Sequence, residues 1–135
     1  MVGLKVWRGF CNITENMKKE FNAVVVKHGI NVSEQYAQSL EFWMELKVQG
    51  GGGVVFCVSG PWSTNYRNKF AYSLKKVMNV LGVDDLSKVD GKPLRAIFET
   101  KDGMFLGAPI VGIKHFLDDD EVFIPREDDF YTTND

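Results

Sequence analysis

Polar and basic side chains gather around the predicted start of a helix. The run Ser59–Thr64 ends in hydroxyl residues suited to capping, and Arg67 and Lys69 follow it closely. Free N–H groups and the helix dipole attract anions at such a terminus, and cationic side chains add to the attraction. We expect a site for a phosphorylated ligand, with Trp62 or Tyr66 stacking on a base; capping beside a solvated basic face is the alternative. The candidate anion-binding residues here are Ser59, Trp62, Ser63, Thr64, Arg67 and Lys69.

Lys114 and His115 form a second polar pair, within a predicted strand. Successive side chains of a strand point to opposite faces, so one of the two faces the core side and the other faces solvent. Acid–base work by His115 needs a carboxylate partner, and Asp118 is the nearest in sequence. A histidine that is simply part of the packed structure is the alternative. We add Lys114 and His115 to the candidate anion-binding residues.

Other patterns that often carry chemistry are incomplete in this chain. A strand, not a helix, is predicted to follow Gly50–Gly53, so the glycine run favours a flexible hairpin over a phosphate-binding loop. The two cysteines and two histidines lack zinc-site spacing, and no serine or cysteine nucleophile motif is present. We therefore predict a non-enzymatic protein without a metal or cofactor.

The charge of the chain is unevenly distributed. The net charge is −2, but the last twenty residues, Phe116–Asp135, contain eight acidic residues and one basic residue. That segment carries −7 and the preceding residues carry +5. Acidic and aromatic side chains together suit a surface that engages a basic partner, whereas a solvated turn is the simpler reading. The candidate partner-binding residues are Asp118, Asp119, Asp120, Glu121, Asp128, Asp129, Phe130 and Tyr131.

The elements that must position these residues define an α+β fold. We predict one domain, 1–135, with an acidic tail from about residue 118, in which an antiparallel sheet packs on one long amphipathic helix. Apolar residues alternate along Ser39–Val48, although Trp43 falls on the polar face. The other predicted elements are a short helical segment at Asn16–Phe21, strands at Ala23–Val26, Val54–Val58, Leu94–Glu99, Ile110–Leu117 and Val122–Ile124, and a helix at Asn65–Leu81 that ends at Gly82.

The segment from Leu40 to Pro125 resembles a family of short proteins encoded by phages and prophages. That family has a glycine-rich hairpin, an amphipathic helix, a V-G-V-x-x-W-x-x-L-x-G-K-x-x-R-V run and a G-H-x-x-x-D-x-W-F-x-P end. Leu86, Val122 and Lys114 stand where the family has two tryptophans and a glycine. The resemblance implies a phage accessory protein and supplies no mechanism. The matching positions are Gly82, Val83, Gly91, Lys92 and Arg95, and the closing element looks like Lys114–Asp118 followed by Val122–Pro125 after a slight expansion.

Three classes of function follow from these observations. The first is a non-enzymatic counter-defence protein that inhibits a host immune factor or sequesters a nucleotide signal. The second is an accessory protein that binds single-stranded nucleic acid through basic and aromatic side chains; the third, with least support, is a small hydrolase. The chain has no signal-peptide pattern and no apolar stretch of membrane-spanning length, which predicts a cytoplasmic protein of the host cell, and a sheet edge offers a route to a homodimer. The basic residues of the second class are Lys18, Lys19, Arg67, Lys69, Lys75 and Lys76.

Overall fold

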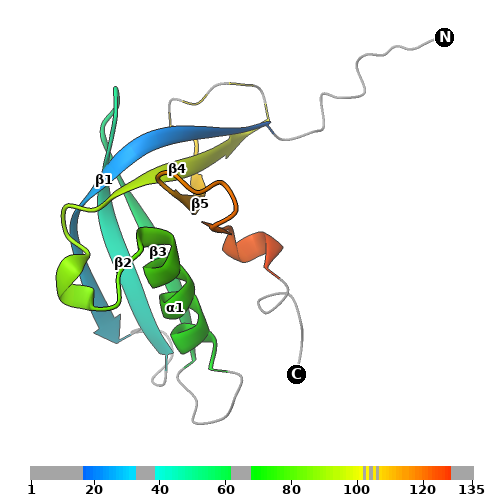
Figure 1. The fold of residues 1–135 in the computed structure, drawn as a ribbon. Helices are drawn as coiled ribbons and strands as arrows, with labels where there is room; N and C mark the ends of the chain where they lie inside the picture. The colour runs from blue at the N-terminus through cyan, green and yellow to red at the C-terminus, as the bar shows by residue number, and fades with distance from the viewer. Residues whose placement is uncertain are drawn as a thin grey trace.

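A computed structural model describes residues 17–32, 39–61, 68–101, 103, 105 and 107–128. Six antiparallel strands form one sheet in the order β3-β2-β1-β4-β5-β6, and a single α-helix packs on it (Figure 1). The predicted α+β class is therefore confirmed for these residues. The elements are β1 (Met17–Val32), β2 (Ser39–Val48), β3 (Gly53–Pro61), α1 (Lys69–Leu81), β4 (Pro93–Thr100), β5 (Ile110–His115) and β6 (Val122–Phe123), with 3₁₀ turns at Leu86–Lys88 and Pro125–Glu127.

The first strand corrects the prediction of a short N-terminal helical segment at Asn16–Phe21. Met17–Phe21 belongs to β1 and pairs with β4, in the register Met17↔Thr100 to Val24↔Pro93. Tertiary pairing overrides the weak local helix signal, because each residue gains a partner strand. Asn16 lies outside the described residues.

A β-bulge between Val25 and Lys27 allows β1 to pair with two different strands. Met17–Asn22 pair with β4 alone, Ala23 and Val24 pair with both β4 and β2, and after the bulge only the pairing with β2 continues. At the changeover the Val25 N–H donates to the Lys92 carbonyl (3.0 Å) and the Val25 carbonyl accepts from Gly91 N–H (2.8 Å). Bulges bend a strand and increase its twist, so this one turns β1 from one half of the sheet into the other.

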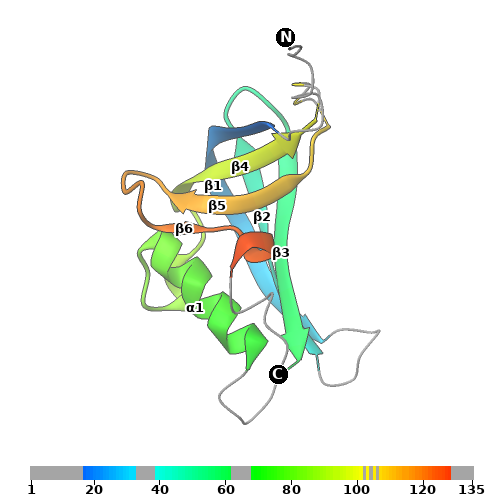
Figure 2. The same ribbon diagram turned by 90° about the vertical axis from the view of Figure 1, so that its right-hand side faces the viewer.

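The bent sheet forms a partly open barrel. The strand β3 approaches β5 from the far end of the sheet, and α1 packs against both (Figures 1 and 2). The connectivity is that of the OB-fold. A meander β1-β2-β3 is followed by a helix and then by a hairpin β4-β5, whose first strand pairs with β1.

The helix α1 packs its apolar face on the inner face of the sheet. Asn68 caps its N-terminus by accepting a hydrogen bond from Ala71 N–H (2.9 Å), and Gly82 ends it at φ 71°. The predicted end at Gly82 is correct, since glycine adopts this left-handed conformation without strain. Phe70 and Val77 enter the core between the sheet halves. The part of the chain that the structure describes has no helix long and apolar enough to cross a membrane.

The chain after β6 folds over the outer side of β5. A Cβ atom placed on Gly112 would lie 2.6 Å from Ile124 Cγ1 and 2.7 Å from the Phe123 carbonyl oxygen, so only glycine fits beneath this crossing. The crossing covers the outer face of β4, where Ile97 and Glu99 are only 2% and 7% exposed. Glycine at residue 112 thus allows the C-terminal segment to seal one side of the barrel.

Gly112→Ala should destabilise the fold by about 1–3 kcal/mol, the usual cost of forcing extra volume into a packed contact. Gly51→Ala is the matched control, because its Cβ would meet no atom within 4 Å and its φ is not positive. The control should leave the free energy of unfolding unchanged or raise it by about 0.4–1 kcal/mol. Urea titrations of both variants measure the difference, and equal effects would contradict this account.

Candidate functional site

The predicted anion site at the helix start is not assembled as expected. The helix was predicted from Asn65 but begins at Lys69, and Asn68 rather than a residue of the Ser59–Thr64 turn caps it. Ser59 lies within β3, exposed and opposite Glu41 of β2. The remaining members of this group lie outside the described residues: Trp62, Ser63, Thr64 and Arg67.

Lys114 and His115 lie at the opposite end of α1 from Lys69. Lys114 forms an ion pair with Glu20 of β1. The imidazole Nδ1 of His115 accepts hydrogen bonds from the backbone N–H groups of Leu117 and Asp118, both at 3.0 Å. An Nδ1 that accepts two bonds carries no proton, so the ring proton resides on Nε2.

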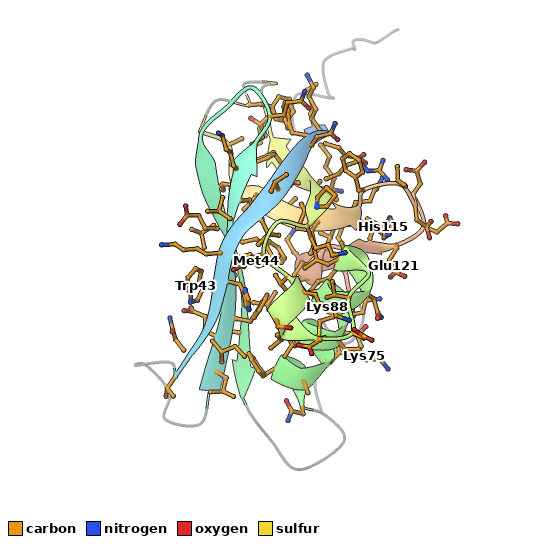
Figure 3. The ribbon with its side chains drawn as sticks, turned by 60° about the vertical axis from the view of Figure 1, so that its left-hand side comes forward. Trp43, Met44, Lys75, Lys88, His115 and Glu121 are labelled. Carbon is orange, nitrogen blue, oxygen red and sulfur yellow. The ribbon has the colours of Figure 1, made fainter. Side chains whose placement is uncertain are left out.

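The His115 imidazole thus holds a turn together, and the pairing with the Asp118 carboxylate that acid–base work would need is not observed. That carboxylate accepts instead from Asp120 N–H at 2.9 Å. Glu121 and His115 lie beside the end of α1 (Figure 3), where the Glu121 carbonyl accepts from His115 N–H at 2.8 Å. These contacts account for the histidine as a structural residue.

Several residues of the acidic segment bind basic or hydroxyl groups of the barrel. Asp119 pairs with Arg95 (2.7 Å), and the hydrogen bond and charge of this guanidinium lower the pKa of Asp119. Glu127 pairs with Lys18 (2.6 Å), and both carboxylate oxygens of Asp128 accept from the Tyr72 hydroxyl (2.9 and 3.0 Å). Part of the acidic surplus is therefore neutralised within the molecule. Asp129, Phe130 and Tyr131 lie outside the described residues.

Trp43 lies at the centre of the outer face of β1, β2 and β3, away from α1 (Figure 3). Its neighbours in register are Gly29 on one side and Cys57 on the other. A Cβ on Gly29 would lie 2.7–2.9 Å from the indole ring, so the ring lies directly over the glycine. With its amide oxygen turned toward the indole, Asn31 accepts from Trp43 Nε1 at 3.2 Å. These contacts fix a partly exposed aromatic ring in position.

Charged residues of both signs surround the indole. Lys27 of β1 pairs with Glu45 of β2 (3.6 Å), whereas within the described residues no carboxylate is recorded in ion-pair contact with Lys47. Alternation places these side chains on the same face as Trp43. A partly exposed ring with ammonium groups within a few residues is an arrangement suited to stacked bases and phosphates. We define this outer face, centred on Trp43 with Lys27 and Lys47, as the tryptophan face.

Cys57 completes the tryptophan face as a protonated thiol. Burial, followed by the hydrogen bond to Glu41 and the charge of that carboxylate, raises the pKa of Cys57 to about 12. The thiolate is the nucleophilic form of cysteine, so at neutral pH this thiol is not an activated nucleophile. Groups of three or more metal-ligating side chains are absent from the described ranges.

The sequence reasoning missed the tryptophan face, although the printed sequence contains its signal. Trp43 breaks the alternation of Ser39–Val48 by standing on the polar face. Gly29, three residues after the predicted strand Ala23–Val26, lies inside β1 and makes room for that ring. A large aromatic at a polar position opposite a glycine in a neighbouring strand is the combination that identifies the site.

Comparison of the chain with protein-family models, with curated proteins and with solved structures gave no significant match. The likeness to the OB-fold therefore rests on strand connectivity. The function must be argued from the geometry of the chain itself.

Cys57 should be alkylated far more slowly than an ordinary thiol. A group with its pKa raised to about 12 is almost wholly protonated at pH 8.5, where a free cysteine is about half thiolate, so iodoacetamide should react roughly a thousandfold more slowly. The rate should climb with pH up to about 12. Peptide mass spectrometry of the Cys11→Ser variant measures it. Glu41→Gln should speed the reaction, and an unchanged rate would contradict the role of this carboxylate.

Proposed function

We propose that this protein binds single-stranded nucleic acid on the tryptophan face. The observation that carries the proposal is the position of Trp43, held over Gly29 on the outer face of the second and third strands in a fold with OB-type connectivity. That face is the common oligonucleotide-binding surface of such barrels. Fold likeness raises the expectation of binding, and the fixed aromatic ring supplies the chemistry.

The chemistry of the tryptophan face favours binding without strong sequence preference. A base stacked on an aromatic side chain contributes about 1–3 kcal/mol, and every base has such a face to offer. Lys47 and Lys27 supply positive charge for phosphates, but Glu45 and Glu41 oppose them on the same face. We therefore expect modest affinity that falls with salt rather than tight, specific recognition.

Trp43→Ala should weaken the binding of a fluorescein-labelled oligothymidine roughly 5- to 150-fold, which corresponds to the loss of one stacked base. Fluorescence anisotropy titrations at several salt concentrations measure the dissociation constant. Trp43→Phe should retain part of the affinity, because phenylalanine also stacks. Lys47→Ala should reduce the slope of log K against log salt by about 0.7, the contribution of one phosphate contact on a single strand.

Val55→Ala is the matched control for these variants. Val55 is also apolar and exposed on the outer face, in β3 opposite Glu45, but it has no ring. Its loss should leave affinity for the oligonucleotide nearly unchanged. The proposal fails if wild-type protein shows no binding at low salt, or if Trp43→Ala and Val55→Ala behave alike.

The acidic turn after β5 supports a second candidate function, a counter-defence protein that binds a host factor. Leu117 is 81% exposed and Phe116 is 36% exposed, directly before Asp118 and Asp120. An exposed apolar pair beside carboxylates suits a basic protein partner, since the apolar residues anchor and the charge steers. The resemblance to phage accessory proteins is compatible with this function but supplies no mechanism for it.

Leu117→Ser should abolish capture of a host protein by the immobilised chain, because it removes the most exposed apolar side chain of the turn. Quantitative mass spectrometry of proteins retained from host lysate measures this, with Val55→Ala as the control. Retention of the same proteins by wild type and Leu117→Ser would contradict a role for the turn.

A further inference from the structure

A second candidate binding site lies at the end of the barrel where the glycine hairpin meets the β4–β5 connection. A cavity of about 450 Å³ opens there, within the range of roughly 300–1,000 Å³ typical of small-molecule sites. Its walls are mostly apolar. The lining residues used below are Phe21, Phe98, Phe105, Gln49, Gly51 and Gly52.

Three phenylalanine rings form the apolar part of this cavity. The ring of Phe21 meets that of Phe98 edge-on at a centroid distance of 5.6 Å and that of Phe105 at 6.1 Å. Phe98 is almost fully buried, whereas Phe21 and Phe105 remain partly exposed on the cavity side. A planar aromatic ligand can therefore pack on the ring of Phe21, which β1 positions, and on the ring of Phe105, which the β4–β5 connection supplies.

Lys19 places a positive charge at the edge of this aromatic cluster. Its ammonium lies 5.3 Å from the centre of the Phe21 ring and 5.8 Å from that of Phe105. The neighbouring cations on the outer face, Lys18 and Lys114, have acidic partners. Across the described part of the chain, the contacts recorded for the Lys19 ammonium are the two rings, so its charge is available to an anion.

Two glycines of the hairpin, Gly51 and Gly52, have no structural explanation in the fold. Gly50 has a φ of 75°, which accounts for glycine there, but Gly51 and Gly52 have no positive φ. Added Cβ atoms at Gly51 and Gly52 would meet nothing within 4 Å. The fold therefore tolerates side chains at both positions. Bare backbone beside an aromatic cavity allows a ligand to approach the peptide groups closely.

We propose that this cavity binds a nucleoside monophosphate unit, with the base on Phe21 and Phe105 and the phosphate on Lys19. The aromatic walls fit a planar base, the ammonium fits the phosphate, and the bare hairpin leaves room for the ligand at the mouth. Gln49 lines the cavity with an amide that can hydrogen-bond the edge of the base. A free nucleotide and the terminal nucleotide of a strand share this chemistry.

The cavity is separate from the tryptophan face, and the proposal does not depend on nucleic-acid binding there. Val48, which lines the cavity, points to the inner side of β2, whereas Trp43 points to the outer side of the same strand. A nucleotide can therefore occupy the cavity while Trp43 is removed. This separation lets one set of variants test the two sites independently.

Isothermal titration of the full chain with AMP and with adenosine tests the proposal. AMP should bind, and adenosine should bind at least fivefold more weakly because it lacks the phosphate that Lys19 holds. Lys19→Gln should reduce the affinity for AMP to that for adenosine, and Phe105→Ala should weaken AMP roughly 5- to 150-fold through loss of stacking. Gly52→Val, which narrows the mouth without a backbone clash, should also weaken AMP.

Val55→Ala serves as the control and should leave AMP binding unchanged, because Val55 is exposed on the outer face of β3 and does not line the cavity. A second comparison uses oligothymidine with a 5′-phosphate and oligothymidine with a 5′-hydroxyl. Tighter binding of the phosphorylated form, lost in Lys19→Gln, would support the cavity as a site for strand ends. This result would count even if AMP alone does not bind. AMP binding that is insensitive to Lys19→Gln and to Gly52→Val would overturn the proposal. So would the absence of binding by AMP together with equal binding of the two oligonucleotide forms.

Discussion

The bulge in β1 is the constraint on which the rest of the barrel depends. Because the strand changes partners at Val25–Lys27, a single sheet can supply both halves of the barrel and enclose the core on which α1 packs. The turn at Gly91–Lys92 fixes the changeover with two hydrogen bonds to Val25. A second tie, from His28 Nδ1 to the Asp90 carboxylate at 2.7 Å, attaches the second half of β1 to the same turn. Removing the bulge would shift the register of every later residue of β1 by one and turn its side chains to the other face, so that Gly29 would no longer lie beneath Trp43.

The sequence predicted those elements that depend on interactions between residues close together in the chain, and it failed for those that depend on distant residues. The hairpin of β2 and β3, the later strands and the end of α1 at Gly82 were all predictable, because alternation, helical spacing and a glycine cap are local signals. The segment Met17–Phe21 was predicted as helical because its strand partner, β4, lies about 75 residues away in sequence. The helix start was placed too early for a similar reason, since the true cap, Asn68, follows several other residues able to cap. A short segment with polar residues on both faces lacks the alternation of apolar and polar residues that would identify it as a strand.

The candidate sites show the same difference between groupings that are local in sequence and groupings that depend on strand pairing. Residues grouped in sequence, such as Lys114 with His115, proved to have structural partners, and the acidic turn is partly neutralised by Arg95. The tryptophan face combines Trp43, Gly29 and Lys27 from strands whose register no single-strand pattern reveals. The phenylalanine cavity likewise needs β1, β4 and the β4–β5 connection together. In both cases the signal in the sequence was a residue that its local element does not require: an indole on a polar face, and glycines at positions where alanine fits.

The pairing of β1 with β4 also affects how the chain emerges during synthesis. Translation at roughly 5–20 residues per second delivers β4 about 4–15 seconds after β1, so β1 waits that long with one edge unpaired. Throughout this interval Val24, Val26 and Ile30 are accessible to other nascent chains or to chaperones, and they remain partly exposed even in the folded barrel. Charged residues directly before Phe21, namely Lys18, Lys19 and Glu20, act as gatekeepers that disfavour wrong pairing of the first half of the strand. The barrel closes only when the ribosome has delivered the last third of the sequence.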